Sequence, residues 1–241
     1  MQDAISIIIP VYHEENIILK FLEHVNNRFS GTVYEIIVVD GDKHASTIKH
    51  IHDPSVIRLT SEKGRSNQMN LGAANSKYNI LFFLHADSML PKKPFLSITK
   101  ALAQPHMKAG AFDLCIASQN MLIRLIEKLA SIRSRITQIP YGDQGLFIRK
   151  DIFNEIGGYS NIPIMEDIDI MLKLKKMKYQ ITILNTSIKT SARRWETQGI
   201  LYCSMRNIVL SSLFYLGTDP NKLVNYYDKK NRSGRWRACA S

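Results

Sequence analysis

Apolar runs and helix-like segments alternate along the first part of the chain. Continuous apolar runs are typical of strands that are buried on both faces, and here they occupy residues 5–9, 34–39, 56–59 and 80–84. The segments between them have helical patterns and occupy residues 15–29, 43–52 and 66–74. Strands that alternate with helices in this order predict parallel βαβ units. We therefore expect an α/β fold with a Rossmann-like, mostly parallel sheet, in which residues 80–84 form a central strand.

The second half of the chain has a more mixed pattern. It predicts helices at 94–103, 121–136, 151–156, 165–178 and 197–216, strands at 109–116 and 145–149, and two strands at 179–184 and 187–190 that pair with each other. We expect one domain over residues 1–217, with a nucleotide-binding half at 1–90 and an acceptor half at 91–217, followed by a basic tail at 218–241.

The helix at 121–136 has a marked apolar stripe beside basic residues. The stripe consists of Leu122, Leu125, Ile126, Leu129, Ile132 and Ile136. We expect it to pack into the core. The alternative is that the basic remainder of the helix faces an anionic acceptor or a membrane surface.

The chain is basic, with 32 Lys and Arg against 21 Asp and Glu and a formal net charge of +11. This charge favours anionic partners such as nucleotides or an acidic membrane surface. The basic residues are spread along the chain and no nucleic-acid motif accompanies them, so we expect no nucleic-acid binding. The three cysteines, Cys115, Cys203 and Cys239, follow no metal or redox spacing, which predicts free thiols in a reducing compartment.

No segment of the sequence resembles a secretory leader or a membrane span. The longest apolar region, residues 200–216, is interrupted by polar residues, among them Arg206 and Asn207. We therefore expect a cytoplasmic protein. The region at 200–216 and the basic tail could still rest on a membrane as a peripheral contact, or form a homodimer contact.

Two carboxylates follow strands that should be parallel. Asp40 ends the run at 34–39, and Asp87 follows the run at 80–84 together with His85 and Ser88. Carboxyl ends of parallel strands meet at one edge of a sheet, where α/β proteins bind ligands. Asp40 could accept hydrogen bonds from a ribose or a base, and Asp87 could hold Mg²⁺ or Mn²⁺ against a phosphate. The alternative for Asp87 is that it only caps a turn.

Two other segments could carry chemistry. The sequence Lys63-Gly64-Arg65 enters a helix, where backbone N–H groups and a guanidinium could bind a diphosphate, although an ordinary helix start has the same pattern. Glu166 and Asp167 open another helix and could supply a general base, although acidic residues in a first turn also stabilise helices. Residues 11–14 lack the glycine-rich turn of dinucleotide-binding proteins, and no P-loop is present in the sequence.

These segments together resemble the family-two glycosyltransferases. The resemblance lies in ISIIIPVYHEE at 5–15, IVVDGD at 37–42, FLHADS at 83–88 and MEDID at 165–169, and it covers about residues 4–180. It implies the GT-A fold, a nucleotide-diphosphate sugar donor, a divalent metal (Mn²⁺ or Mg²⁺) and inverting chemistry. Among nucleotide-diphosphate sugars we expect a UDP-sugar as the donor. The acceptor is an unknown compound with a hydroxyl group.

The resemblance also implies roles for single residues. Asp167 matches the family's catalytic base, with Glu166 supporting the acceptor site, and Asp87 matches the last aspartate of its metal-binding DxD motif, with His85 beside it. The nucleotide-sugar would be held by Pro10, Tyr12, Glu14, Asp40, Gly64, Arg65 and Ala86. His85 stands in place of the first acid of DxD, which makes weak metal affinity plausible.

Within the family, the chain is most similar to the radical-SAM/selenodomain-associated transferases, some of which are linked to arsenosugar synthesis. This likeness lies in GRSNQMNLGA at 64–73, YGDQG at 141–145 and SARRW at 191–195. The last segment lacks the glutamine of the QxxRW motif of processive synthases, which argues against polymer synthesis. Two other functions stay open: a sugar nucleotidyltransferase, whose glycine-rich signature residues 10–15 lack, and a non-catalytic module that binds nucleotide-sugars.

Overall fold

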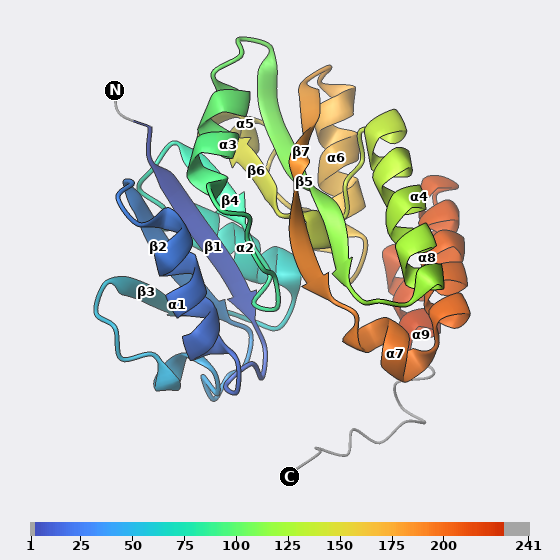
Figure 1. The fold of residues 1–241 in the computed structure, drawn as a ribbon, viewed down its shortest axis with the longest axis horizontal. Coiled ribbons are helices and arrows are strands. Elements are labelled where there is room, and N and C mark those ends of the chain that lie inside the picture. Colours follow the sequence, from blue (N-terminus) through green and yellow to red (C-terminus); the bar gives the residue numbers. More distant parts are fainter. Residues whose placement is uncertain (1–2, 229–241) are drawn as a thin grey trace.

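The structure, a computed structural model, describes residues 3–228, apart from the side chains of residues 194, 225, 227 and 228. A seven-stranded sheet in the order β3-β2-β1-β4-β6-β5-β7 forms its middle layer (Figure 1). The strands are β1 (Ile5–Val11), β2 (Tyr34–Asp40), β3 (Val56–Thr60), β4 (Ile80–Phe83), β5 (Met107–Ala117), β6 (Leu146–Arg149) and β7 (Gln180–Ser191). The strand predicted at 80–84 is therefore the central one.

Helices cover both faces of this sheet and its β5–β7 end. The α-helices are α1 (Ile18–Phe29), α2 (Arg65–Ala74), α3 (Pro94–Leu102), α4 (Met121–Thr137), α5 (Lys150–Glu155), α6 (Glu166–Lys176), α7 (Arg193–Gln198), α8 (Ile200–Tyr215) and α9 (Pro220–Asp228). Short 3₁₀ turns lie at η1 (Ile48–His50) and η2 (Gly142–Gln144). Helices α1 and α3 pack on one face and α2, α5 and α6 on the other, so each face has its own apolar core.

The first four strands follow the predicted βαβ pattern. Strand β1 pairs in parallel with β2 and with β4, and β2 pairs in parallel with β3. Ile7 and Ile9 contribute to the core on the α1 side, whereas Ile8 contributes to the core on the α2 side. A strand that buries both faces needs apolar residues at every position, which is why these runs were continuous in the sequence.

The second half completes the sheet with mixed pairing. Strand β6 lies between β4 and β5 and is antiparallel to both, while β5 and β7 are parallel. The prediction that residues 179–184 and 187–190 pair with each other is wrong, because both belong to β7 and pair with β5. A register shift between Ala111 and Asp113 accommodates the polar residues between the two apolar stretches of β7.

Helix α4 does not pack into the core with the stripe that we predicted. Its buried residues are Ile123 and Ser134 instead. Five residues of the stripe are between 51% and 78% exposed: Leu122, Leu125, Leu129, Ile132 and Ile136. On this buried side the hydroxyl of Ser134 donates to the carbonyl of Ala130 and contacts the side-chain oxygen of Gln144 at 2.8 Å.

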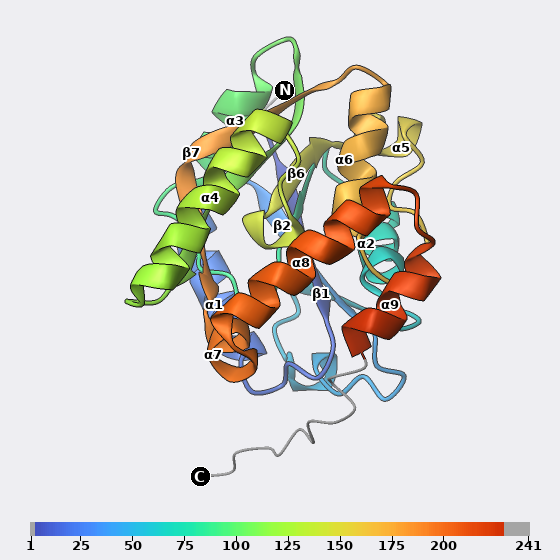
Figure 2. The same ribbon diagram turned by 90° about the vertical axis from the view of Figure 1, so that its right-hand side faces the viewer.

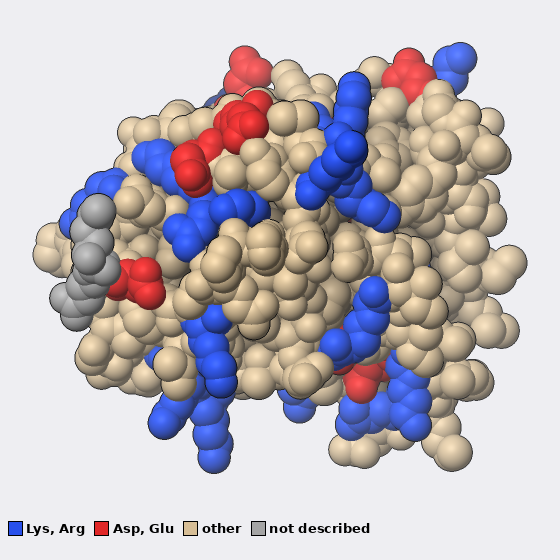
Figure 3. Space-filling model, turned by 90° about the horizontal axis from the view of Figure 1, so that it is seen from above, with Lys and Arg blue, Asp and Glu red and all other residues tan. Residues whose placement is uncertain are grey.

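The C-terminal region is more divided than the sequence pattern indicated. The prediction of a single helix at 197–216 is wrong, because the chain is divided at Gly199. This residue has φ of 93°, which is not helical, and it separates α7 from α8. The predicted basic tail begins with α9, and its remainder, residues 229–241, lies outside the described residues. Within the described chain, no helix is both long enough and apolar enough to traverse a bilayer. Lys and Arg side chains stand in separate groups on the face shown in Figure 3.

Candidate active site

The loop after β2 is organised by Asp40. This residue is fully buried, and its Oδ1 accepts a hydrogen bond from the backbone N–H of Asp42 at 2.9 Å. Its Oδ2 accepts from the backbone N–H groups of Thr47 and Ile48 at 2.8 and 3.2 Å. Asp40 therefore holds residues 41–48 against the end of β1. Direct contact with a nucleoside would require this buried carboxylate to become accessible, so that role stays a prediction.

The end of β1 presents an exposed aromatic ring at the same edge. Pro10 is half-buried within the strand, and Tyr12 follows it with 39% of its surface exposed. The Nζ of Lys63 lies 4.3 Å from the centroid of the Tyr12 ring. A flat ring beside an ammonium group suits a base and the phosphates attached to it. The sequence analysis placed Tyr12 at this edge but gave Lys63 no role of its own.

Glu14 shares this edge with three other charged side chains. Burial raises the pKa of the Glu14 carboxyl, Arg193 opposes that rise, Asp87 adds to it and Arg65 opposes it again. Arg193, Asp87 and Arg65 therefore all lie near enough to Glu14 to affect its carboxyl. Arg193 begins α7, about 180 residues after Glu14, and the sequence gave no signal that the two would meet.

The polar residues after β4 divide between the surface and the interior. Asp87 is exposed, Ala86 is buried and His85 lies between them in exposure. The ring of His85 lies beside Gly142, where an added Cβ would be 3.4 Å from the ring. The same Cβ would be 3.6 Å from the Cβ of Asp167. Gly142 thus lies next to both His85, which we predicted beside a metal, and Asp167, the predicted base.

Asp167 is fixed at the start of α6 by two backbone hydrogen bonds. Its Oδ2 accepts from the N–H of Gly142 and its Oδ1 from the N–H of Ile168, both at 2.8 Å. Met165, just before the helix, has a left-handed backbone with φ of 67°. Such a conformation is costly for a residue with a side chain and is often found at functional sites. It turns the chain so that the acidic pair opens the helix.

Glu166 is buried beside Asp167 and faces Arg65. Burial raises the pKa of Glu166 to about 7, the charge of Asp167 raises it as well, and Arg65 opposes the rise. The Nη1 of Arg65 lies 3.7 Å from the Oε1 of Glu166. Because Arg65 also lowers the pKa of Glu14, it lies within electrostatic reach of both Glu14 and the acidic pair. Gly64 precedes it with φ of 141°, a conformation that suits glycine.

The region around the predicted base also contains groups to which the sequence assigned no role. The guanidinium of Arg133 lies 3.5 Å from the centroid of the Tyr141 ring. Burial raises the pKa of Tyr215, with further effects from Tyr141, Arg133 and Asp167. Helices α4 and α8 therefore each bring a polar group near the predicted base.

The residues present could hold a divalent metal only if phosphate oxygens of a substrate supplied further ligands. Among the described residues, no group of three His, Cys, Asp or Glu side chains could hold a metal ion. The carboxylate of Asp87 has no hydrogen bond or salt bridge within the described chain, and His85 is two residues away. Mg²⁺ is commonly held by one or two carboxylates together with substrate phosphates, and this donor set is of that kind.

Comparison with known proteins identifies the domain. The family model for glycosyl transferase family 2 matches residues 6–157. The chain belongs to glycosyl transferase family 2. All predicted site residues except Glu166 and Asp167 lie within the matched part, and the acidic pair follows shortly after it.

Relatives and solved structures agree with this family. A dolichol-phosphate mannosyltransferase of Pyrococcus furiosus is 26% identical over 64% of this chain and 45% of its own length. An uncharacterized glycosyltransferase of Haemophilus influenzae is 25% identical over 70% of this chain and 61% of its own length. This chain thus spans about half the length of these relatives.

Two solved structures share the fold. A mannosyltransferase of Pyrobaculum calidifontis, solved with GDP-Man and Mn²⁺, has a TM-score of 0.61 at 18% identity over 79% of this chain and 57% of its own. TarS of S. aureus has a TM-score of 0.58 at 15% identity over 85% of this chain and 64% of its own. These similarities confirm the expected GT-A fold.

Proposed function

We propose that this family 2 domain transfers a sugar, with inversion, from a nucleotide-diphosphate donor to a hydroxyl group of an acceptor. The observation that supports this proposal is that the residues predicted to bind the donor lie close to the predicted base. Arg65 acts on both Glu14 and Glu166, and Gly142 lies between His85 and Asp167. Donor phosphates and an acceptor hydroxyl could therefore meet in one place.

Asp167 is the proposed general base. Each of its oxygens accepts one backbone hydrogen bond, which fixes the carboxylate and leaves a second lone pair on each oxygen for a proton. Asp167 removes the proton of the acceptor hydroxyl while that oxygen attacks the anomeric carbon. The bond from this carbon to the diphosphate breaks on the opposite side, so the configuration is inverted. General base catalysis contributes about 10²- to 10⁴-fold.

The cationic side chains stabilise the leaving diphosphate in this proposal. Arg65 and Arg193 face the region of Glu14 and Asp87, and Lys63 lies beside Tyr12. Asp87, with His85 near it, would hold Mn²⁺ or Mg²⁺, whose chemistry when bound is to neutralise the departing diphosphate. The inverting mechanism and the use of metal follow from the resemblance to the family together with this arrangement.

The donor base and sugar are open to a direct test. We expect a UDP-sugar, whereas the Pyrobaculum calidifontis structure was solved with GDP-Man, so both donor types should be compared. Some of the radical-SAM-associated transferases that the chain resembles are linked to arsenosugar synthesis, but the resemblance leaves the acceptor unknown. A panel of UDP- and GDP-sugars, each with and without MnCl₂, can be screened by thermal unfolding of the full chain. A donor at 100 times its Kd stabilises the folded state by about 2.7 kcal/mol.

A matched pair of variants makes this screen specific. Asp87→Asn should remove the Mn²⁺-dependent part of the thermal shift. Asp53→Asn, in the turn that precedes β3, should leave the shift unchanged. The proposal fails if none of the nucleotide-sugars shifts the transition of the wild-type chain.

The one alternative that a structural observation favours is a non-catalytic module that binds nucleotide-sugars. His85 stands where the family has an acid, and the described residues contain no three-ligand metal cluster. Such a module would give the thermal shift but no turnover of the donor. Release of the nucleoside diphosphate, with and without Mn²⁺, distinguishes the two functions.

A further inference from the structure

Helices α4 and α8 expose apolar stripes on the same side of the molecule. Figure 2 looks at this side, where α8 runs next to α4. The exposed apolar residues of α4 are Met121, Leu122, Leu125, Leu129, Ile132 and Ile136. Those of α8 and the residue after it are Leu201, Met205, Ile208, Val209, Tyr215 and Leu216. We refer to these two stripes together as the α4/α8 apolar surface.

The spacing of these residues shows that the exposure is regular. On α8, the positions 201, 205, 208, 209, 215 and 216 all fall on one side of a helix with 3.6 residues per turn, while Cys203 and Leu210 on the other side are buried. Soluble proteins rarely expose large contiguous apolar patches unless a partner or a membrane covers them. Nothing in the described chain covers this surface, because its residues are between 47% and 86% exposed.

Basic residues line one edge of the α4 stripe. Arg124, Lys128 and Arg135 are spaced by four and seven residues, which places them along the same side of the helix. The side chain of Arg124 is 46% exposed and that of Arg135 is 38% exposed. Arg124 and Arg135 pair with Glu127 and Asp113, which are 18% and 16% exposed, so the net positive charge of this edge comes from the exposed Lys128.

The sequence around α8 adds no negative charge. Residues 197–218 contain no Asp or Glu. In Figure 3, the right-hand margin, which is the side on which Figure 1 places α4 and α8, shows few charged side chains. The surface as a whole therefore combines an apolar centre with a cationic edge.

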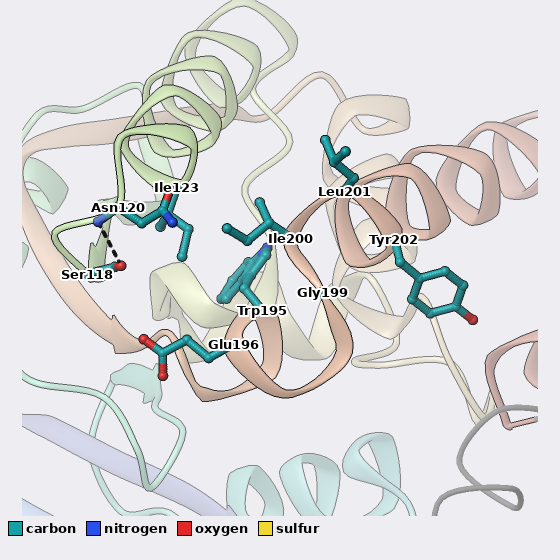
Figure 4. A pocket seen from close by; sticks show the side chains of 9 residues that line it. All are labelled: Ser118, Asn120, Ile123, Trp195, Glu196, Gly199, Ile200, Leu201 and Tyr202. Carbon is teal, nitrogen blue, oxygen red and sulfur yellow. Dashed lines mark hydrogen bonds between the residues drawn. The ribbon is translucent and has the colours of Figure 1, made fainter.

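A hollow at the beginning of both helices extends this apolar surface inward. It has a volume of about 600 Å³ and lies between the start of α4, α7 and the start of α8 (Figure 4). Ile123, Trp195 and Ile200 lie close together within it, and Tyr202 stands at its margin. Trp and Tyr are enriched where proteins meet the headgroup region of a bilayer.

We propose that the α4/α8 apolar surface docks on the surface of a bilayer that contains anionic lipids. An apolar stripe bordered by cations is the pattern of helices that lie in a membrane interface, with the apolar side in the acyl boundary and the cations at anionic headgroups. A second copy of the chain fits less well. A two-fold contact would place the Lys128 edge against an identical surface that offers few exposed acids.

Docking in this way would also place the membrane near the proposed base. Tyr215, at the end of the α8 stripe, and Asp167 are close enough for Asp167 to affect the pKa of Tyr215. This step rests on the proposed function: an acceptor hydroxyl in or on the bilayer could reach Asp167 from the docked side. Docking itself needs neither donor nor turnover, so it can be tested independently of the transferase activity.

Vesicle flotation of the full chain tests the docking. We expect the wild-type chain to float with vesicles of phosphatidylglycerol and phosphatidylcholine in equal parts, and to float less with pure phosphatidylcholine. Leu125→Ser with Leu129→Ser should lower the bound-to-free ratio at least about tenfold, because two leucines leave the buried area. Lys128→Glu should lower it at least about fivefold.

The chain offers controls with matching exposure elsewhere. Leu19 and Leu96 are 54% and 57% exposed, against 53% and 57% for Leu125 and Leu129. They lie on α1 and α3, so Leu19→Ser with Leu96→Ser should leave flotation unchanged. Circular dichroism of each variant confirms that it is folded, which is expected because all four leucines are exposed.

Three results would overturn the proposal. The first is a wild-type chain that does not float with the anionic vesicles. The second is an equal loss of flotation in the control and the surface variants. The third is a stable dimer in sedimentation analysis that Leu125→Ser with Leu129→Ser converts to a monomer, since the surface would then be covered by a second copy.

Discussion

Glu166 allows a quantitative prediction of how stability depends on pH. The pKa of its carboxyl is raised from 4.5 to about 7, first by burial and then by Asp167, while Arg65 opposes the rise. Between these two pH values, the folded chain keeps a proton that the unfolded chain has lost. The free energy of unfolding therefore falls as the pH rises from 4.5 to 7, and the full penalty remains above pH 7.

The size of the effect follows from the same values. The difference between 4.5 and about 7 corresponds to ~3 kcal/mol, at about 1.4 kcal/mol for each pH unit. Glu166→Gln keeps the size of the side chain and removes its ionisation. In this variant, the free energy of unfolding should lose only the part of its pH dependence that comes from Glu166. It should gain up to ~3 kcal/mol relative to the wild type between pH 5 and pH 8.

Urea unfolding at pH 5, 6, 7 and 8, followed by circular dichroism, measures this gain directly. Glu23→Gln is the control, because Glu23 is an exposed residue of α1 far from the acidic pair in the sequence. Its stability relative to the wild type should not change with pH. The reasoning is refuted if the difference between Glu166→Gln and the wild type is the same at pH 5 and pH 8.

Two further substitutions test the packing that supports the site. Gln68→Leu should lower the free energy of unfolding by about 1–3 kcal/mol, because its Nε2 donates to the buried carbonyls of Val11 and Val39 at 2.6 and 2.8 Å. Gly110→Ala should cost at least about 1–3 kcal/mol, since the added Cβ would lie 2.5 Å from a Phe147 ring atom and 2.6 Å from a backbone oxygen. Both are measured by urea unfolding, and a change below about 0.5 kcal/mol in either would contradict the packing described.

The parallel half of the fold could be predicted because its signal is local. Each strand buried on both faces appears as a continuous apolar run, and the order of strands and helices limits the topology. The pairing of β6 could not be predicted in this way. Nothing in the four residues of β6 shows that the strand inserts between β4 and β5 in the opposite direction.

The exposure of α4 could not be predicted from its periodicity. The pattern shows which residues share one side of the helix, but not which side faces the sheet. In the structure, the side that carries Ile123 and Ser134 is the buried one. The apolar stripe is therefore free for a different contact.

The sequence singled out most of the candidate acids and one of the cations, Arg65, but it assigned no role to Lys63, Arg133 or Arg193. Asp87, Glu166 and Asp167 stood out because polar residues end an apolar run or begin a helix. Arg193 and Gly142 lie in segments that carried the likeness to a subgroup of the family, at 191–195 and 141–145, but nothing in those segments indicated a place in the site. Their positions depend on how α7 and η2 fold back on the end of the sheet, which only the complete topology determines.

The central claim is that Asp167 removes the proton of the acceptor in transfer from a nucleotide-sugar. The most direct measurement compares Asp167→Asn with the wild type, once a donor is known, for both donor binding and release of nucleoside diphosphate. Asp169→Asn is the matched control, because Asp169 lies in the same helical turn and pairs with Lys173 at 3.5 Å. The account predicts that Asp167→Asn binds donor normally and loses turnover at least about 10²-fold, while Asp169→Asn retains it. Turnover by Asp167→Asn equal to that of the wild type would contradict it.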